Sequence, residues 1–344
     1  MKFTKDGKPY VIAELGANHN GDMGLARRLI RAAKDAGADC VKFQSWDVNL
    51  FAKEVYDKND FNPDRPSGEP SLRETMERYA MTPAKLREMA AFAREIGIDC
   101  ASTPFEVEQV GVQVELGAPF MKIASMDVVN DHLLTAAART GKPILLSTGL
   151  AELGEIEHAL GTLEVHGATD IVVLHCVALY PPKDEEVNLR NMATLARAFG
   201  RPVGFSDHTI GAEAALAAVA LGAVVIEKHF TLDKNMAGWD HSISADPPEL
   251  KAIVDGAKRI HAALGSERRI VTERDAAQRR NFRRSVVTAK ALKKGDRISL
   301  DHLTYRRPGT GIEPNHAHEL VGMVAARDIP DNTLLKMTDL QIAG

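Results

Sequence analysis

Short runs of apolar and β-branched residues alternate with longer amphipathic stretches over the first three quarters of the chain. Such alternation is typical of strand-helix units that build a parallel sheet. We predict strands over residues 10–16, 40–46, 99–105, 120–125, 143–149, 171–177, 202–208 and 224–230. The helices predicted after them cover residues 25–36, 84–96, 107–116, 131–139, 153–166, 189–199, 212–221 and 248–264.

This number of strand-helix repeats matches the α/β fold called the (β/α)8 or TIM barrel, which has about 250 residues. A doubly wound open sheet is the alternative. That fold usually carries a glycine-rich first turn, and the chain contains no G-x-G-x-x-G or Walker A sequence. We therefore expect a TIM barrel over residues 1–265.

One connection, residues 47–81, is too long for a structural loop between a strand and a helix. We predict that it forms a lid or a wall of a functional site. Two helix starts lie at its end. Ser71 and Glu74 have the spacing of a capping box, and Thr82 precedes Pro83 as an N-cap precedes a proline in the first helical position.

The composition changes after Gly265. Residues 267–297 carry eleven lysines and arginines against four acidic residues, with one aromatic residue, Phe282. Segments that bind nucleic acid interleave basic and aromatic residues, so we interpret residues 266–282 as a solvated linker. From residue 283 to 344, short β-prone runs alternate with turn signals, which predicts a small, mostly-β domain.

The overall composition excludes several classes of protein. With 44% hydrophobic residues, 26% charged residues and a net charge of −4, the chain lacks the basic character of a nucleic-acid-binding protein. It shows neither a signal peptide nor an apolar membrane span, so we expect no membrane association and a cytoplasmic location. Cys40, Cys100 and Cys176 are widely spaced, which indicates reduced structural thiols.

Polar residues gather where the predicted strands end. In a TIM barrel, alternate strand residues point inward, and the active site is built at the carboxyl ends of the strands. Several of the polar residues are two positions apart and therefore share one face of a strand. We predict a polar site made by Glu14, Lys42, Gln44, Thr103, Lys122, Ser125, Asp127, Ser147, His175, Ser206, His208, Glu227 and His229.

His208 and His229 end neighbouring predicted strands and should converge at one mouth of the barrel. Neutral imidazoles suit a divalent metal ion such as Mn²⁺, Zn²⁺, Co²⁺ or Fe²⁺. The alternative is that both are hydrogen-bonded rim residues without a ligand. The remaining metal ligands would come from Glu14, Asp207, Asp240 or His241.

Lys42 and Lys122 interrupt apolar strands, where an unpaired ammonium group is costly to bury. With nearby hydroxyl groups they predict an anion site that a phosphate-bearing substrate would fit. Alternatively, either lysine would form a Schiff base if burial lowered its pKa. The hydroxyl groups belong to Thr103, Ser125, Ser147 and Ser206.

Nine short motifs occur in one order along the chain: AELGANHNG, VKFQ, STPF, KIAS, LSTG, HCVALYP, GFSDHT, IEKHFT and RRPGTGI. Through them the chain resembles the sialic acid synthase family. Members of this family are transferases that condense phosphoenolpyruvate with an open-chain N-acylated amino sugar to a nonulosonic acid and phosphate. The tail resembles the antifreeze-like SAF domain that follows the barrel in this family.

The resemblance implies roles for single residues. The family's metal ligands match His208 and His229, and the ion would be Mn²⁺, with Mg²⁺ or Co²⁺ as alternatives. A catalytic glutamate matches Glu14, and Asp127 stands where many members carry a second glutamate. The groups that bind phosphoenolpyruvate match Lys42, Thr103, Lys122, Ser125, Ser147 and Ser206. Those that bind the sugar match Gln44, Tyr180, Asp240 and Arg307, and this arginine would enter the partner's active site in a domain-swapped homodimer.

The chain departs from the family pattern in places. Synthases that act on N-acetylmannosamine commonly read K-I-G-S-G-E where this chain has KIASMD, and they carry Asn where this chain has Ala178. The forms found here look more like the pseudaminic acid and spore-coat branches. The sugar therefore stays open between an N-acetylmannosamine type and a 2,4-diacetamido-2,4,6-trideoxyhexose.

Two other functions are alternatives to the synthase. One is a phosphoenolpyruvate-dependent 3-deoxy-aldulosonate-phosphate synthase, which would need additional basic residues for a second phosphate. The other is a non-catalytic sugar-binding protein, which the tail alone would suggest. The many ionisable side chains at one mouth argue against the sugar-binding protein, because such groups are costly to bury in a protein that does no chemistry with them.

Overall fold

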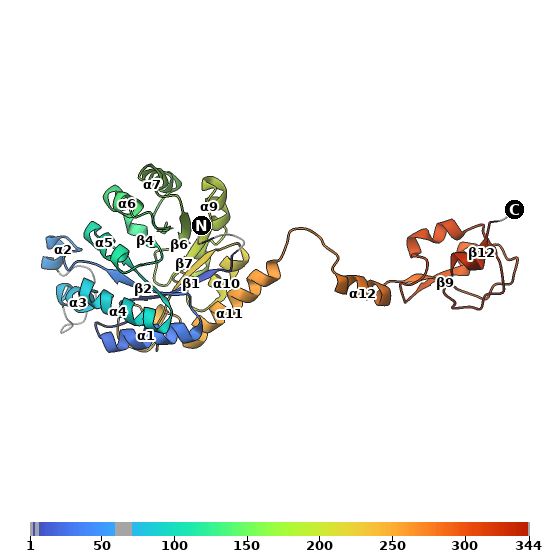
Figure 1. Cartoon of the computed structure of the whole chain (residues 1–344), viewed down its shortest axis with the longest axis horizontal. Helices are drawn as coiled ribbons and strands as arrows, with labels where there is room; N and C mark the ends of the chain where they lie inside the picture. The colour runs from blue at the N-terminus through green and yellow to red at the C-terminus, as the bar shows by residue number, and fades with distance from the viewer. Residues whose placement is uncertain (1–2, 4–6, 59–70, 343–344) are drawn as a thin grey trace. The chain divides into compact units, whose positions relative to one another are not determined.

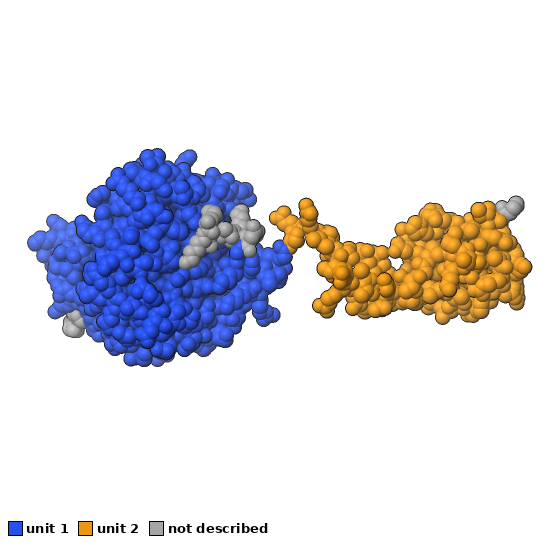
Figure 2. All heavy atoms as spheres, viewed as in Figure 1, with its two compact units in different colours: residues 1–265 blue, residues 266–344 orange. Residues whose placement is uncertain are grey.

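The computed structural model of the chain describes residues 3, 7–58 and 71–342. It contains two compact units, Met1–Gly265 and Ser266–Gly344, which Figure 2 distinguishes by colour. Figure 1 labels their helices and strands. Within the described residues, no helix combines the length and the apolar character needed to cross a membrane.

Parallel strands form the centre of the first unit. Their order in the sheet is β3-β2-β1-β8-β7-β6-β5-β4, and β3 and β4 at its two ends lie next to each other. The sheet therefore curls into a barrel, which confirms the predicted TIM barrel and excludes the open sheet. The strands are β1 (Tyr10–Gly16), β2 (Cys40–Ser45), β3 (Asp99–Pro104), β4 (Met121–Ile123), β5 (Ile144–Ser147), β6 (Ile171–Cys176), β7 (Val203–Asp207) and β8 (Val225–His229).

Helices surround the barrel on its outer face (Figure 1). They are α1 (Met23–Ala36), α4 (Pro83–Ile96), α5 (Val107–Glu115), α6 (Asp131–Ala138), α7 (Leu153–Val165), α9 (Asn191–Phe199), α10 (Glu213–Ala220) and α11 (Pro247–Leu264). Thr82 caps α4 as predicted, because its side chain accepts a hydrogen bond from the Lys85 amide. The short helix α8 (Asp184–Val187) was not predicted.

The long connection between β2 and α4 contains two helices in its described parts, α2 (Lys53–Lys58) and α3 (Leu72–Tyr79). Ser71 and Glu74 form the predicted capping box of α3. Residues 59–70 of the predicted lid or wall lie outside the described residues.

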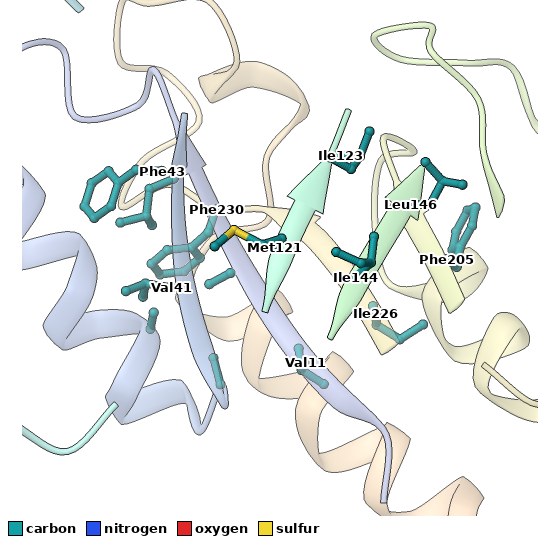
Figure 3. Packing of buried hydrophobic residues seen from close by; sticks show 14 of the residues in the cluster. Val11, Val41, Phe43, Met121, Ile123, Ile144, Leu146, Phe205, Ile226 and Phe230 are labelled. Carbon is teal, nitrogen blue, oxygen red and sulfur yellow. The ribbon is translucent and has the colours of Figure 1, made fainter. Parts of the chain in front are cut away.

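Side chains alternate between the two faces of each strand. Outward residues such as Val41, Met121 and Ile226 pack in the layer between strands and helices (Figure 3). Inward apolar residues, including Cys40 and Val225, form a separate cluster near the amino ends of the strands. The opposite, carboxyl ends are thereby left to the polar side chains.

The second unit is mostly β structure, as predicted. Strand β9 (Ser285–Thr288) pairs with β10 (Leu303–Arg306), and β11 (Val324–Ala325) pairs with β12 (Leu340–Gln341), both antiparallel. The 3-10 turns η3 (Leu300–His302), η4 (Pro314–Leu320) and η5 (Met337–Asp339) connect these strands around their own apolar core. The segment predicted as a linker, residues 266–282, contains the helix α12 (Glu273–Phe282), which has no buried residue.

Candidate active site

A cavity of about 600 Å³ lies at the carboxyl ends of the barrel strands. Most of the side chains predicted for the site line it, because inward residues on adjacent strands end at the same rim. The predicted residues that line this cavity are Glu14, Lys42, Gln44, Thr103, Lys122, Ser125, Ser147, Tyr180, Ser206, His208, Glu227 and His229.

A cluster of buried charge forms the floor of the cavity, and we call Glu14, Lys42, Lys122 and Glu227 the charge cluster. The Lys42 ammonium pairs with Glu14 and donates a hydrogen bond to Thr103 Oγ1 at 2.7 Å. Glu227 lies between the two lysines, since its oxygens are 3.7 Å from Lys42 Nζ and 3.5 Å from Lys122 Nζ. The carboxylate of Glu227 therefore holds both amino groups on one side of the cavity.

The members of the charge cluster titrate differently. Burial raises the pKa of Glu14 to about 7, although the Lys42 ammonium opposes this shift. Burial also acts to raise the pKa of Glu227, but Lys122 and Lys42 outweigh it and lower that pKa to about 2. Near neutral pH, Glu227 is ionised and Glu14 is only partly so. Burial also lowers the pKa of Lys122. Burial acts in the same direction on Lys42, but Glu14 and Glu227 outweigh it and raise the pKa of Lys42, so its ammonium group is the more persistent positive charge for an anionic ligand.

The hydroxyl groups around the charge cluster are not all engaged. Ser206 donates to Glu227 Oε1 at 3.1 Å, and Ser125 Oγ accepts from the Gly149 amide at 2.9 Å. The buried Ser147 hydroxyl has no hydrogen-bond partner in the described part of the chain. A buried polar group without a partner is rare in a closed core and suits a ligand-binding surface.

His208 and His229 meet at the rim, with ring centroids 5.4 Å apart. Burial lowers the pKa of His208 to about 4 and that of His229 to about 3, so both rings are neutral near pH 7. His208 Nδ1 donates to the Val177 carbonyl oxygen at 2.8 Å, which leaves its Nε2 lone pair free. Within residues 3, 7–58 and 71–342, His229 Nδ1 has no hydrogen-bond partner, and it lies 3.5 Å from Asp240 Oδ2.

This pair of neutral imidazoles fits a divalent metal ion. Among the described residues, no three side chains of the types His, Cys, Asp and Glu gather closely enough to hold an ion by themselves. Water or substrate would therefore fill the remaining positions, as at catalytic rather than structural metal sites.

Two residues considered as further metal ligands point elsewhere. Asp207 was a wrong choice, because its side chain lies on the other face of β7 and pairs with Lys228 at 2.9 Å. His241 faces away from the cavity and contacts Thr231 Oγ1 at 2.7 Å and Asn20 Oδ1 at 3.3 Å. Register explains the first error, since Asp207 is one residue away from the inward-facing Ser206.

Asp127 and Asp240 are predicted site residues of the first unit that do not line the cavity. Asp127 belongs to the 3-10 turn η1 (Ser125–Asp127) and accepts a hydrogen bond from Asn130 Nδ2 at 3.0 Å. Asp240 lies beside the cavity at His229. Arg307 belongs to the second unit, where its guanidinium group lies 4.8 Å from the centre of the Phe282 ring.

On β6, the residue that lines the cavity is not the one that was predicted. His175 faces outward, stacks on Phe205 with ring centroids 5.7 Å apart and contacts the Val187 carbonyl oxygen at 2.7 Å. The next residue, Cys176, lines the cavity instead. Including His175 among the mouth residues was therefore wrong, because inward positions alternate along β6.

The sequence pattern missed an apolar wall around the outer cavity. Leu50, Phe51 and Met76 come from the long connection, whose predicted role as a wall is confirmed for its described parts. The alternation along the strands does not mark these residues, because Leu50 and Phe51 follow β2 in an irregular segment and Met76 belongs to the helix α3. The full apolar wall consists of Trp46, Leu50, Phe51, Met76, Phe105, Met126, Leu150 and Trp239.

Comparison with known proteins gives a consistent result. N,N'-diacetyllegionaminic acid synthase of Campylobacter jejuni is 40% identical over 331 residues, which cover 96% of this chain and 99% of that protein. Pseudaminic acid synthase of the same species is 36% identical over 342 residues and 98% of both chains. The crystal structure of N-acetylneuraminic acid (sialic acid) synthetase from Leptospira borgpetersenii serovar Hardjo-bovis, in complex with citrate, superposes with a TM-score of 0.70. It is 33% identical and covers 79% of this chain and 90% of that chain.

Family models match both parts of the chain. The model of the NeuB family matches residues 29–269, and that of the SAF domain matches residues 283–341. The chain therefore belongs to the NeuB family of enzymes and carries a SAF domain at its C-terminal end.

Proposed function

We propose that this protein condenses phosphoenolpyruvate with an open-chain N-acylated amino hexose to a nonulosonic acid and phosphate. The observation that carries this proposal is the floor of the cavity, where two buried amino groups and an unpartnered serine hydroxyl face a space of about 600 Å³. An anion with a phosphate and a carboxylate would occupy these groups.

The new carbon–carbon bond forms when C3 of phosphoenolpyruvate attacks the aldehyde carbon of the sugar. The electrons come from the enol double bond, and the aldehyde oxygen takes up a proton. Lys42 and Lys122, with Thr103 and Ser147, hold the phosphate and carboxylate in place while C2 becomes electron-poor. A divalent ion on His208 and His229, most suitably Mn²⁺, would polarise the aldehyde as a Lewis acid.

Phosphate then leaves by cleavage of its bond to C2. Water adds to C2 and passes one proton to a carboxylate. The C2–O bond to phosphate then breaks with its electron pair leaving on phosphate, and the second water proton passes from the C2 hydroxyl to the departing phosphate as the ketone forms. Glu14 suits the proton transfer, because it lines the cavity and its pKa is raised to about 7. Asp127, which is hydrogen-bonded to Asn130 away from the cavity lining, suits this role less well.

The apolar wall favours one of the two sugar types. A 2,4-diacetamido-2,4,6-trideoxyhexose has a methyl group at C6 and two acetyl methyl groups, which gain from burial against side chains such as Leu50 and Met76. N-acetylmannosamine would place additional hydroxyl groups against the same wall without partners. The similarity to legionaminic and pseudaminic acid synthases points in the same direction.

Phosphate release from phosphoenolpyruvate tests this function. We expect release with Mn²⁺ and 2,4-diacetamido-2,4,6-trideoxyhexoses, weaker release with N-acetylmannosamine, loss on EDTA treatment and recovery when Mn²⁺ is returned. Release with phosphorylated aldoses instead would support the aldulosonate-phosphate synthase. Sugar binding without release under any condition would support a non-catalytic protein.

Arg307 is proposed to act on the sugar in the partner's active site of a domain-swapped homodimer. Subunit mixing tests this without shortening the chain. Arg307→Ala and His208→Ala would each be inactive, but mixed dimers would regain one complete site if the arginine acts across the dimer. Mixtures that stay inactive after subunit exchange would refute this role.

A further inference from the structure

The segment between β8 and α11, residues 230–246, brings two side chains to the cavity. Trp239 joins the apolar wall and contacts Tyr79 edge-on, with ring centroids 5.3 Å apart. Asp240 places its carboxylate 3.5 Å from His229 Nδ1. Apart from the short turn η2 (His241–Ile243) and a β-bridge between Phe230 and Ala245, the segment is irregular, so other contacts must hold Trp239 and Asp240 in place.

The carboxylate of Asp240 also lies close to two other polar side chains, those of Glu14 and Gln44. A side-chain carbon at Gly16 would come within 3.3 Å of Asp240 Oδ2, 3.4 Å of Glu14 Oε1 and 3.5 Å of Gln44 Nε2. Because Gly16 has no such carbon, the three side chains approach one another from β1, β2 and the segment 230–246. A small displacement of this segment would separate them.

Five side chains attach the segment to the loop after β1, and we call Asn18, Asn20, Thr231, His241 and Ser244 the mouth clamp. Asn18 Nδ2 donates to the Phe230 carbonyl oxygen at 2.9 Å and to Ser244 Oγ at 2.8 Å. Ser244 in turn donates to the Asp240 carbonyl oxygen at 2.6 Å. One contact of the mouth clamp is therefore made directly to the backbone of Asp240.

The second half of the mouth clamp runs through His241. Asn20 Nδ2 donates to the Ala237 carbonyl oxygen at 2.9 Å, which leaves Asn20 Oδ1 as the acceptor facing His241 Nε2 at 3.3 Å. His241 then carries its proton on Nε2, and its Nδ1 accepts from the Thr231 hydroxyl at 2.7 Å, a shorter contact than the 3.2 Å from that hydroxyl to the Asp233 carbonyl oxygen. Every group in this chain of contacts has a matching partner when the imidazole is neutral.

Gly238 lies against the same contact. A side-chain carbon there would come within 2.6 Å of the His241 ring and 2.7 Å of Asn20 Oδ1. The contact between Asn20 and His241 therefore leaves no room for any side chain at residue 238, directly before Trp239 and Asp240.

No member of the mouth clamp lines the cavity. We propose that the mouth clamp is a positioning network that sets the affinity for the amino sugar by fixing Trp239 and Asp240, without acting on phosphoenolpyruvate. This inference rests on the proposed function. The groups assigned to phosphoenolpyruvate lie at the ends of barrel strands and make none of the contacts of the mouth clamp. Substitutions in the mouth clamp should therefore change KM for the sugar much more than KM for phosphoenolpyruvate.

Steady-state kinetics with both substrates test the proposal. Asn20→Ala, Thr231→Val and Gly238→Ala should each raise KM for the sugar by about ten- to a hundredfold, because misplacing a binding group by about 1 Å has effects of this size. KM for phosphoenolpyruvate should change less than about twofold. His241→Leu should behave like Asn20→Ala, and His241→Gln, which can still donate to Asn20, should recover part of the loss. His158→Leu on α7 removes an exposed contact to Asp131 of α6 and serves as the matched control.

A second measurement does not depend on turnover. Trp46 and Trp239 are the only tryptophans of the chain, so Trp46→Phe leaves Trp239 as the sole tryptophan reporter. In that background, Asn20→Ala and Gly238→Ala should increase the quenching of Trp239 fluorescence by acrylamide, and His158→Leu should not. Unchanged quenching, or equal rises of both KM values, would overturn the proposal. Failure of the wild-type protein to release phosphate would refute the proposed function, while the fluorescence would still decide whether the mouth clamp holds Trp239.

Discussion

Two groups of buried charge lie on opposite faces of strand β8. Glu227 on β8 points into the barrel with both lysines of the charge cluster within 3.7 Å. The next residue, Lys228, points to the other face and pairs with Asp207 of β7 at 2.9 Å, and we call these two residues the outer pair. Two consecutive residues of β8, Glu227 and Lys228, therefore each take part in a buried contact between an amino group and a carboxylate, one on each face of the strand.

The two groups differ in how completely they are satisfied. Lys228 Nζ contacts the Asp207 carboxylate, the Thr209 carbonyl oxygen and the Thr209 hydroxyl, while Asp207 Oδ1 accepts from the Thr209 amide at 2.8 Å. In the charge cluster, Glu227 Oε2 has no hydrogen-bond partner among the residues that the structure describes, and the amino groups border an open cavity. A closed set of contacts indicates a structural role, and an open set indicates a ligand site.

The largest stability effect is expected at the outer pair. Lys228→Met leaves the Asp207 carboxylate buried without its counter-charge, which should lower the free energy of unfolding by about 3–5 kcal/mol. Urea unfolding measures this. Asp207→Asn combined with Lys228→Met should recover most of the loss, because no unpaired charge remains. Lys251→Met, which breaks an exposed pair with Asp255, is the control and should change the free energy of unfolding far less than Lys228→Met. A loss below about 1 kcal/mol for Lys228→Met would contradict the structural role.

Substitutions in the charge cluster should lower the activity much more than the stability of the protein. Lys122→Met is expected to lower kcat/KM for phosphoenolpyruvate by about 10²–10³-fold, because one cation that holds the developing phosphate is lost. Glu227 keeps Lys42 as a partner, so the free energy of unfolding should change by less than about 1 kcal/mol. Phosphate release and urea unfolding of the same preparation measure both quantities. A fall in stability as large as that of Lys228→Met would remove the distinction between the two groups.

The charge cluster also predicts a pH dependence through Glu14. Burial raises its pKa from 4.5 to about 7 in the folded protein. The native state then keeps a proton that the unfolded chain releases, so the stabilisation is complete below about pH 4.5 and is lost as the pH rises through about 7. The difference in unfolding free energy between wild type and Glu14→Gln should fall by up to about 3 kcal/mol over this window. A difference that stays constant between pH 4.5 and 7.5 would show that the native carboxyl titrates normally.

Much of the barrel follows from local pattern. Strands and helices alternate because apolar periodicity changes between two and 3.6 residues, and this is visible without any tertiary information. The same two-residue period places Lys42 with Gln44 and Ser206 with His208 on shared faces, so the main polar groups of the cavity were predictable. The motifs added the family and the SAF domain, which the comparisons bear out.

Other parts of the site depend on where each strand stops. The strand predicted over residues 120–125 ends at Ile123, and the 3-10 turn that follows directs Asp127 to Asn130 instead of the cavity. On β6, the register decides that Cys176 and not His175 faces inward. A shift of one residue reverses the face of a side chain, and the sequence pattern locates strand ends less accurately than that.

The sequence by itself determined the barrel, the mostly-β second unit and the set of charged and imidazole side chains at one mouth. Only the tertiary structure decided that Glu227 holds both lysines, that Lys228 is closed off with Asp207, and that the mouth clamp supports Asp240. The physical reason is distance along the chain. Periodicity reports which residues share a face within one element, whereas these contacts join elements up to about two hundred residues apart, and their geometry exists only once the barrel has closed.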